Sequence, residues 1–319
     1  MIKFVFALLN LCIVTSVWAV PTDAVLAQVT QQVVKVNVAL KSGQAGTGSG
    51  VVIAKNRIVT NCHVVANASS VSVTVGDIVY QGSAITPDWH HDVCLVKVAG
   101  LDAPIATIGS SKGLQYEQPV FAIGYPNVSS TPARTFGHVK GLFAMDDSVI
   151  IRSSSTFKRG ESGGAVFDDA GQLVGIITLK SPGKQTYYYN MPVEWVQALR
   201  DQPEQAITTQ AEPAFWATKT NQWPYFMQVV QPYLTEDWAA LRAVAMHWVK
   251  QEPSNTEALF YLAAAEYAVH DMVNAEAHLK QVTAANAKHS QAIHYLALIK
   301  AESGNSQRAL RHVALLDNE

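Results

Sequence analysis

Three polar residues of this chain could together hydrolyse an amide bond. A serine hydrolase needs a hydroxyl nucleophile, a base that takes its proton, and a third group that holds the base in one tautomer. Ser162 stands between glycines in the segment RGESGG at residues 159–164, where the backbone can turn sharply. His63 follows an apolar stretch, and Asp92 opens an apolar run. These residues predict a nucleophile, a general base and an orienting acid, respectively.

Backbone donors for the negative charge that develops in such a reaction are also available. The N–H groups of Gly160 and Ser162 are predicted to form the oxyanion hole. Two alternatives compete with this interpretation. Gly-x-Ser-x-Gly also occurs at the nucleophile elbow of α/β-hydrolases, but that fold needs an acid and a histidine after the serine, and alternating helices. Asp88 could replace Asp92 as the acid, although only Asp92 begins the apolar run.

Neither a metal nor another cofactor is expected. His90 and His91 directly precede Asp92 and could bind a metal ion with it. Adjacent side chains on a strand point to opposite faces, however, and the chain has no His-Glu-x-x-His motif. The sequence therefore predicts no metal site.

The elements that must position these groups are short strands. Runs of β-branched residues separated by Gly, Pro, Asn and Asp indicate strands at 33–40, 49–54, 71–75, 78–85, 93–98, 120–123, 149–151, 165–167 and 173–179. Many short strands without intervening helices are typical of an all-β barrel or sandwich. One short helix is predicted at residues 193–200.

Three motifs in this order resemble the trypsin-like serine protease superfamily. They are Thr-Asn-x-His-Val at 60–64, Asp-x-x-Leu-x-Lys-Val at 92–98 and Gly-x-Ser-Gly-Gly at 160–164. Together with residues 48–53 and 171–176, they look closest to the bacterial HtrA-like branch. The resemblance covers about residues 30–200 and implies two six-stranded barrels with the active site in the cleft between them. Two departures from better-known relatives stand out. No Ile-Val-Gly-Gly-like segment is seen, so activation as in trypsin is not expected, and helical repeats follow the predicted barrels where HtrA-like proteins usually have a PDZ domain.

The resemblance also implies the position of a specificity pocket. In trypsin-like folds the residue six positions before the serine lies at the base of the primary pocket, and here it is Thr156. Ile176, Ile177, Thr178 and Leu179 are expected to form a wall. Because none of these side chains is charged, we expect a preference for aliphatic or small uncharged residues.

The last third of the chain has a different composition. Residues 202–212 are polar and indicate a linker, after which Ala, Leu and Glu recur at helical spacing. Ala258, Tyr261, Leu262 and Ala275 recur 34 residues later as Ala292, Tyr295, Leu296 and Ala309. Asp271 and Asn305 are predicted to mark equivalent turns. This period resembles tetratricopeptide repeats, with residues 238–251 as a helix of an earlier copy; a generic helical bundle is the alternative.

The N-terminus has the features of a secretory signal peptide. Lys3 is followed by an apolar run at 4–17 and by Val17-Trp18-Ala19, a cleavage-site pattern. The run is short for a retained membrane anchor, the alternative. The predicted domains are therefore a signal peptide at 1–19, a protease domain at 20–204 and a helical domain at 205–319, and the protein is expected to be secreted or periplasmic.

Two cysteines remain after cleavage, Cys62 and Cys94. They neighbour His63 and Asp92, which must lie within hydrogen-bond reach as base and acid. In the oxidising environment that an exported protein enters, these two cysteines can form a disulfide. A disulfide is therefore predicted, with two buried free thiols as the alternative.

Composition limits the partners. The 319 residues carry a net charge of −2, so no basic field would attract nucleic acid. We expect a protein or peptide substrate, a protein partner on the helical repeats, and no stable membrane insertion after signal cleavage. The alternative function is a scaffold in which the barrel is catalytically dispensable.

Overall fold

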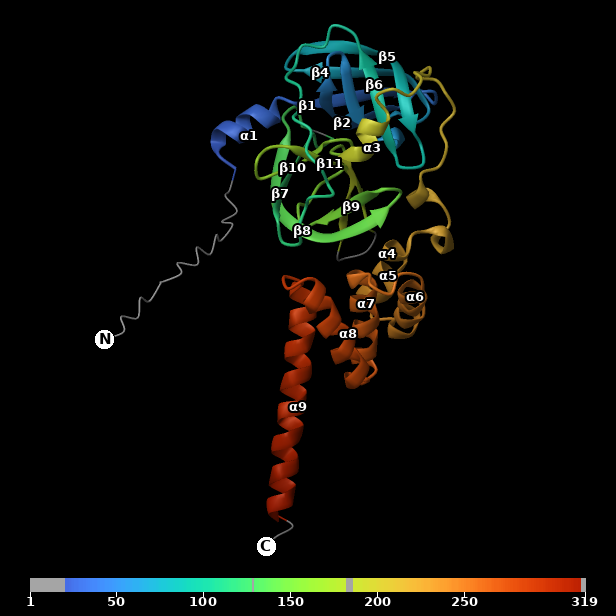
Figure 1. Ribbon diagram of the computed structural model, residues 1–319. Coiled ribbons are helices and arrows are strands. Elements are labelled where there is room, and N and C mark those ends of the chain that lie inside the picture. Colours follow the sequence, from blue (N-terminus) through green and yellow to red (C-terminus); the bar gives the residue numbers. More distant parts are fainter. Residues whose placement is uncertain (1–20, 128, 182–185, 317–319) are drawn as a thin grey trace, which may run out of the picture.

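Two β-barrels followed by a group of helices make up the computed structural model of the chain (Figure 1). The structure describes residues 21–127, 129–181 and 186–316, and side chains as far as residue 304. The predicted signal peptide lies outside these residues.

The first barrel closes in the order β1-β2-β3-β6-β5-β4, with all neighbours antiparallel. Its strands are β1 (Val33–Leu40), β2 (Ala45–Ala54), β3 (Arg57–Thr60), β4 (Ala68–Val75), β5 (Ile78–Asp88) and β6 (Val93–Val98). Alternation along β1 shows how the sequence fills the interior. Val34, Val36 and Val38 are buried, whereas Lys35 and Asn37 are partly exposed.

The second barrel closes in the order β10-β11-β12-β9-β8-β7. Its strands are β7 (Pro119–Gly124), β8 (Ala133–Met145), β9 (Ser148–Ser153), β10 (Ala165–Asp168), β11 (Leu173–Lys180) and β12 (Tyr188–Pro192). All nine predicted strands are present. The sequence analysis missed β3, β8 and β12. β8 contains two glycines, and a Cβ at Gly137 would lie 2.4 Å from the Ser155 amide nitrogen, so close backbone approach interrupts the strand pattern.

Two helices pack on the barrels. Helix α1 (Asp23–Thr30) begins where the Thr22 hydroxyl accepts a hydrogen bond from the Val25 amide, and it buries Leu26 and Val29. Helix α3 (Val193–Ala198) follows β12 and agrees with the helix predicted at 193–200. The short helix α2 (Cys62–Val65) lies inside the first barrel's sequence, directly after β3.

The C-terminal region is helical, as predicted. It contains the 3-10 turns η1 (Phe215–Ala217) and η2 (Thr220–Gln222), and the helices α4 (Tyr225–Gln228), α5 (Val230–Leu234), α6 (Trp238–Gln251), α7 (Thr256–Ala268), α8 (Met272–Ala285) and α9 (Ser290–Leu316). Asp237, Asn255 and Asp271 cap α6, α7 and α8 with side-chain oxygens. Helix α7 is buried on nearly every side, because α6 and α8 flank it.

One prediction for this region is wrong. Asn305 was expected to mark a turn between two helices of a second repeat, but α9 continues as one helix from Ser290 to Leu316. Gly and Asn lower helix stability by only about 1 kcal/mol or less each. The local turn signal at 303–305 is therefore too weak to end the helix.

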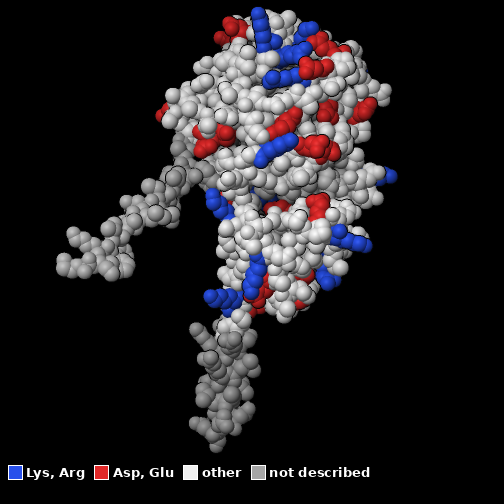
Figure 2. Space-filling model, viewed as in Figure 1, with Lys and Arg blue, Asp and Glu red and all other residues white. Residues whose placement is uncertain are grey.

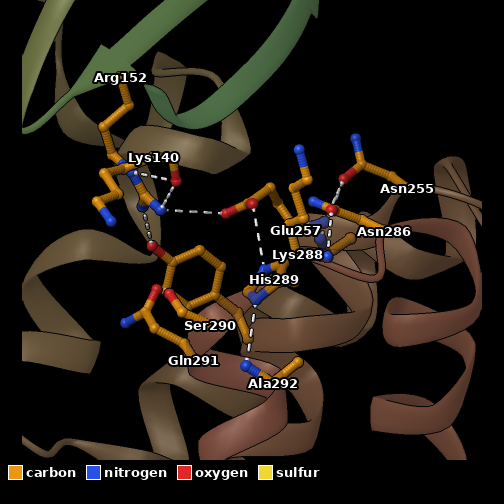
Figure 3. Close-up of polar contacts among 12 residues, drawn as sticks. Lys140, Arg152, Asn255, Glu257, Asn286, Lys288, His289, Ser290, Gln291 and Ala292 are labelled. Carbon is orange, nitrogen blue, oxygen red and sulfur yellow. Dashed lines mark hydrogen bonds and ion pairs between the residues drawn. The ribbon is translucent and has the colours of Figure 1, made fainter. Parts of the chain in front are cut away.

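A buried polar network joins the helices to the second barrel (Figure 3). The Arg152 guanidinium, on β9, donates to the carbonyl of Lys140 at 3.1 Å and to the Tyr261 hydroxyl at 2.9 Å. Glu257 of α7 lies 3.6 Å from Arg152, and its other oxygen lies 3.4 Å from Nε2 of His289. Since burying one unpaired ion costs several kcal/mol, these contacts link the folding of the two regions.

The charged surface is mixed. Figure 2 shows Lys and Arg interspersed with Asp and Glu, without a broad area of one sign on this face. None of the helices in the described residues combines the length and the hydropathy that a membrane span requires.

Candidate active site

His63 and Asp92 meet because β3 and β6 are neighbours in the first barrel. Thr60 pairs with Cys94, so the segments just beyond the two strands lie side by side. Asp92 holds His63 at two points: Oδ1 accepts the His63 amide at 2.7 Å, and Oδ2 lies 2.6 Å from Nδ1. The Asp92 side chain is 1% exposed and that of His63 36% exposed. The imidazole is therefore oriented by a buried carboxylate while its other edge remains accessible.

The predicted disulfide is confirmed. Cys62 and Cys94 are bonded, with their Cα atoms 4.9 Å apart. Cys62 directly precedes His63, and Cys94 lies two residues after Asp92. The crosslink therefore ties the segment of His63 to the segment of Asp92.

Asn61 is a buried member of the site that the sequence analysis did not single out. Its Nδ2 donates to the Asp92 carbonyl at 3.0 Å and to Oγ1 of Thr178 at 2.9 Å. It thereby connects the backbone of Asp92 to β11 of the second barrel. The Thr-Asn-x-His pattern contained the signal, because a buried asparagine beside a base usually has a bonding role.

Ser162 lies on the loop between β9 and β10, and this loop contacts the first barrel. The Ser162 carbonyl accepts a hydrogen bond from the Ser49 amide at 2.8 Å. Gly163 has φ +84°, and a Cβ there would lie 2.2 Å from the Ser49 carbonyl oxygen and 2.3 Å from Oγ1 of Thr60. Only glycine fits so close to the strand that leads to His63. Among the described residues, no hydrogen bond joins the Ser162 hydroxyl to His63; such bonds often tighten only when substrate binds.

The backbone around Gly160, where the sequence predicts an oxyanion hole, is held by Ser49 of the first barrel. Gly160 has φ +93°, and its carbonyl accepts a hydrogen bond from the Ser49 hydroxyl at 2.9 Å. The Ser49 hydroxyl in turn accepts the Tyr125 amide at 2.7 Å. Within the described part of the chain, the amides of Gly160 and Ser162 donate to no backbone carbonyl. Ser49 thus fixes the Gly160 peptide from the other barrel, a role that sequence reasoning missed.

The predicted specificity residues occupy different environments. Thr156 is exposed, and its carbonyl accepts a hydrogen bond from the Thr135 hydroxyl at 2.6 Å. Ile176 and Ile177 are fully buried among core residues. The Thr178 hydroxyl donates to the Ile176 carbonyl. Of the expected wall, Leu179 is partly exposed and lines an open pocket.

That pocket is built partly by the segment that leads into the helices. It has a volume of about 180 Å³ and is lined mainly by apolar side chains: Leu179, Tyr189, Trp216, Trp223, Met227 and Val230, with Lys180, Ser181 and Gln231. The Trp216 ring meets His63 edge-on, with 5.6 Å between ring centroids. Trp216 therefore separates the imidazole from the pocket. No periodic pattern in the sequence indicated that this tryptophan would reach the site.

The part of the chain that carries this site is similar in sequence to known serine proteases. Residues 48–176 match the trypsin-like peptidase domain family. The Synechocystis protein named "Putative serine protease HhoB" is 30% identical over 164 residues, which cover 48% of this chain and 39% of that protein. The "Probable periplasmic serine endoprotease DegP-like" of Pseudomonas putida is 31% identical over 155 residues, covering 46% and 32%. The chain thus spans about two fifths or less of these relatives.

Two solved structures share the fold. The active form of the Rv3671c protease from M. tuberculosis superposes with a TM-score of 0.53 at 22% identity, over 60% of this chain and 92% of that chain. The HtrA-type protease AlgW with tripeptide gives a TM-score of 0.50 at 24% identity, over 56% and 62%. The first two thirds of the chain are therefore a trypsin-like double barrel, as predicted. The tetratricopeptide-like character of the helices stays a prediction.

Proposed function

We propose that this chain is an exported serine endopeptidase in which Ser162, His63 and Asp92 form the catalytic triad. The observation that carries the proposal is the two-point hold of Asp92 on His63, with 2.6 Å between Oδ2 and Nδ1. A carboxylate that accepts a hydrogen bond from Nδ1–H holds the tautomer in which the Nε2 lone pair is free to act as a base. The glycine-flanked Ser162 loop packs against the strand that precedes this histidine.

The chemistry follows from these positions. Oγ of Ser162 bonds to the peptide carbonyl carbon while Nε2 of His63 takes its proton, and the amides of Gly160 and Ser162 donate to the oxyanion. The imidazolium then protonates the leaving amine as the C–N bond breaks. A water molecule, deprotonated by His63, releases the acyl group and restores the Ser162 hydroxyl. These steps use only the chain's own residues and water.

The substrate preference that we propose is apolar. The exposed, uncharged side chain of Thr156 and the apolar side chain of Leu179, which lines the open pocket, support aliphatic or small residues next to the scissile bond. The pocket beside Trp216 supports a second apolar side chain further along the substrate. The Trp216 ring lies between His63 and this pocket. An extended peptide advances about 3.3 Å per residue, so the pocket suits a substrate side chain at least two positions from the scissile bond.

Peptide-library cleavage tests this preference. Dominant cleavage next to Lys or Arg would overturn it. Replacement of Trp216 by Ala is expected to raise KM more for peptides with an apolar residue at the distal position than for peptides with a polar residue there.

The helical region is proposed to bind a protein rather than to take part in the chemistry. The 34-residue recurrence of Ala258, Tyr261 and Leu262 supports a tetratricopeptide-like repeat, and stacked repeats offer a concave surface for a partner or a substrate. Export is supported by the apolar N-terminus and by the disulfide, which is typical of an oxidising compartment. The DegP-like relatives named as periplasmic agree with this location.

Labelling with a fluorophosphonate probe tests the proposed activity. The wild type is expected to be labelled, and the Ser162→Ala variant is expected to lose the label. Ser83→Ala is the matched control, since Ser83 is exposed on β5 away from the site. A folded wild type that takes no label would favour a catalytically inactive scaffold.

A further inference from the structure

A second cluster of histidine and aspartate lies where turns of the two barrels meet. Residues 89–92 form the turn between β5 and β6, and Asp146 lies in the turn between β8 and β9. The expectation that adjacent histidines here would point to opposite faces is wrong, because they stand on a turn and not on a strand. The rings of His90 and His91 approach each other, with 4.8 Å between centroids.

Three donor atoms converge in this cluster. Oδ2 of Asp146 lies 3.7 Å from Nε2 of His90 and 3.0 Å from Nε2 of His91. All three donor atoms lie within 4.8 Å of one another. Ligands of a tetrahedral zinc ion, at about 2.0–2.1 Å from the metal, lie about 3.3 Å apart. The cluster therefore needs only a small inward shift, and His90, whose side chain is 59% exposed, is free to make it.

Neighbouring groups orient the His91 ring and the turn that carries Asp146. Oδ2 of Asp88 lies 2.6 Å from Nδ1 of His91, which leaves Nε2 as the metal-binding nitrogen. The His91 ring stacks on Trp195, with 3.8 Å between centroids, and the Trp195 indole donates to the Asp146 carbonyl. A carboxylate behind a histidine ligand is the usual arrangement at protein metal sites, because it fixes the ring and raises its basicity.

We propose that His90, His91 and Asp146 bind one divalent transition-metal ion, with zinc as the expected occupant. Two imidazoles and a carboxylate suit zinc, and the exposed side of the cluster leaves a fourth position for water. The ion would join the two barrels next to Asp92. The turn also holds the segment that carries Trp216, since the Phe215 amide donates to the His90 carbonyl at 3.0 Å. The ion's role is to stabilise this junction rather than to take part in hydrolysis.

The test uses the full mature chain without a polyhistidine tag, freed of metal by chelation and titrated with zinc chloride by calorimetry. We expect one equivalent to bind and, at a hundredfold excess over Kd, a rise in Tm of about 5 °C or more. Cobalt(II) at the same site is expected to give a visible absorption spectrum typical of tetrahedral coordination.

Variants locate the ion. His90→Ala and Asp146→Asn are each expected to weaken zinc binding at least about tenfold. The His90 side chain is more than half exposed and lies 3.7 Å from Asp146, so the metal-free His90→Ala variant should unfold close to the wild-type temperature. Asp147→Asn is the matched control, because it removes the same charge from the same turn. The absence of stoichiometric binding overturns the proposal, and so does binding that persists in both variants or is equally weakened in the control.

Discussion

His63 and His91 are held by aspartates in the same way, yet the two pairs face different surroundings. In each pair one carboxylate oxygen accepts the histidine amide and the other lies 2.6 Å from Nδ1. Among the described residues, Nε2 of His63 meets no carboxylate, and the ring contacts Trp216 edge-on. Nε2 of His91 meets Asp146 at 3.0 Å. The same arrangement therefore belongs to the proposed base in one pair and to a contact between the two barrels in the other, and the two pairs differ in the partner of the second nitrogen.

The largest expected effect is on kcat, when the aspartate of each histidine pair is replaced in turn. Asp92→Asn should lower kcat on the order of 10⁴-fold, because an amide favours the wrong tautomer of His63. Asp88→Asn makes the same change in the His91 pair and should leave kcat nearly unchanged. Steady-state hydrolysis of a peptide substrate measures both. Equal losses in the two variants would show that the pairs do not differ in function.

A third pair of a carboxylate and a histidine, Glu257 with His289, is almost completely buried. His289 is fully buried, and Glu257 also faces the buried Arg152 at 3.6 Å. Glu257→Gln should lower the free energy of unfolding by about 3–5 kcal/mol, because it leaves a buried guanidinium without its counter-ion.

Chemical denaturation measures this loss, and Glu276→Gln provides the control. Glu276 forms an exposed pair with Lys280 on α8, and such a pair contributes only about 0.3–0.5 kcal/mol. If the two substitutions cost the same, the network between the barrel and the helices does not stabilise the protein.

The disulfide sharpens the comparison, because its two cysteines adjoin His63 and Asp92 in the sequence. Cys62 and Cys94 are 32 residues apart in sequence, and closing such a loop restricts the unfolded chain by about 3–4 kcal/mol in the entropy model. Replacing both cysteines by Ala should lower the free energy of unfolding by this amount and also reduce kcat. Mass spectrometry of the unreduced protein checks the premise, and two free thiols would contradict it.

The smallest expected effect concerns a carboxylate whose partners are mostly hydroxyls. Glu194 accepts hydrogen bonds from Ser110, from the amide and hydroxyl of Ser111, and from Ser148. Burial acts to raise its pKa, but the bonds from Ser110 and Ser111 outweigh it, so the pKa of Glu194 lies below its ordinary value of 4.5. Its contribution to stability is therefore present above that pH and is lost as pH falls through the folded-state pKa.

Glu194→Gln should accordingly cost about 1–2 kcal/mol at neutral pH and less in acid. Unfolding measured from about pH 7 to about pH 3 should show the two proteins converging. A difference that stays constant over this range would mean that the charge of Glu194 does not contribute.

The sequence predicted most of the fold, because alternating apolar residues report directly on barrel strands. The predicted bounds of two strands, 33–40 and 93–98, agree with β1 and β6. The pattern failed where chain segments approach closely, as at Gly137 in β8, since a glycine there weakens the strand signal. It also failed at Asn305, where a turn signal lies within the continuous helix α9.

The sequence by itself determined which residue types could form the site. It placed His63, Asp92 and Ser162 in motifs of fixed order, and it put Cys62 and Cys94 beside the first two. These predictions needed only short-range information, because each group's position follows from the strand or loop next to it.

Only the tertiary structure decided what surrounds these groups. Barrel closure brings Asp146 to His91 across 55 residues, and docking of the helical region brings Trp216 to His63. Periodicity shows which face of one element is buried but carries no information about which distant element covers it. The pocket beside Trp216 and the junction at Asp146 therefore emerge only when the two barrels and the helices are packed together.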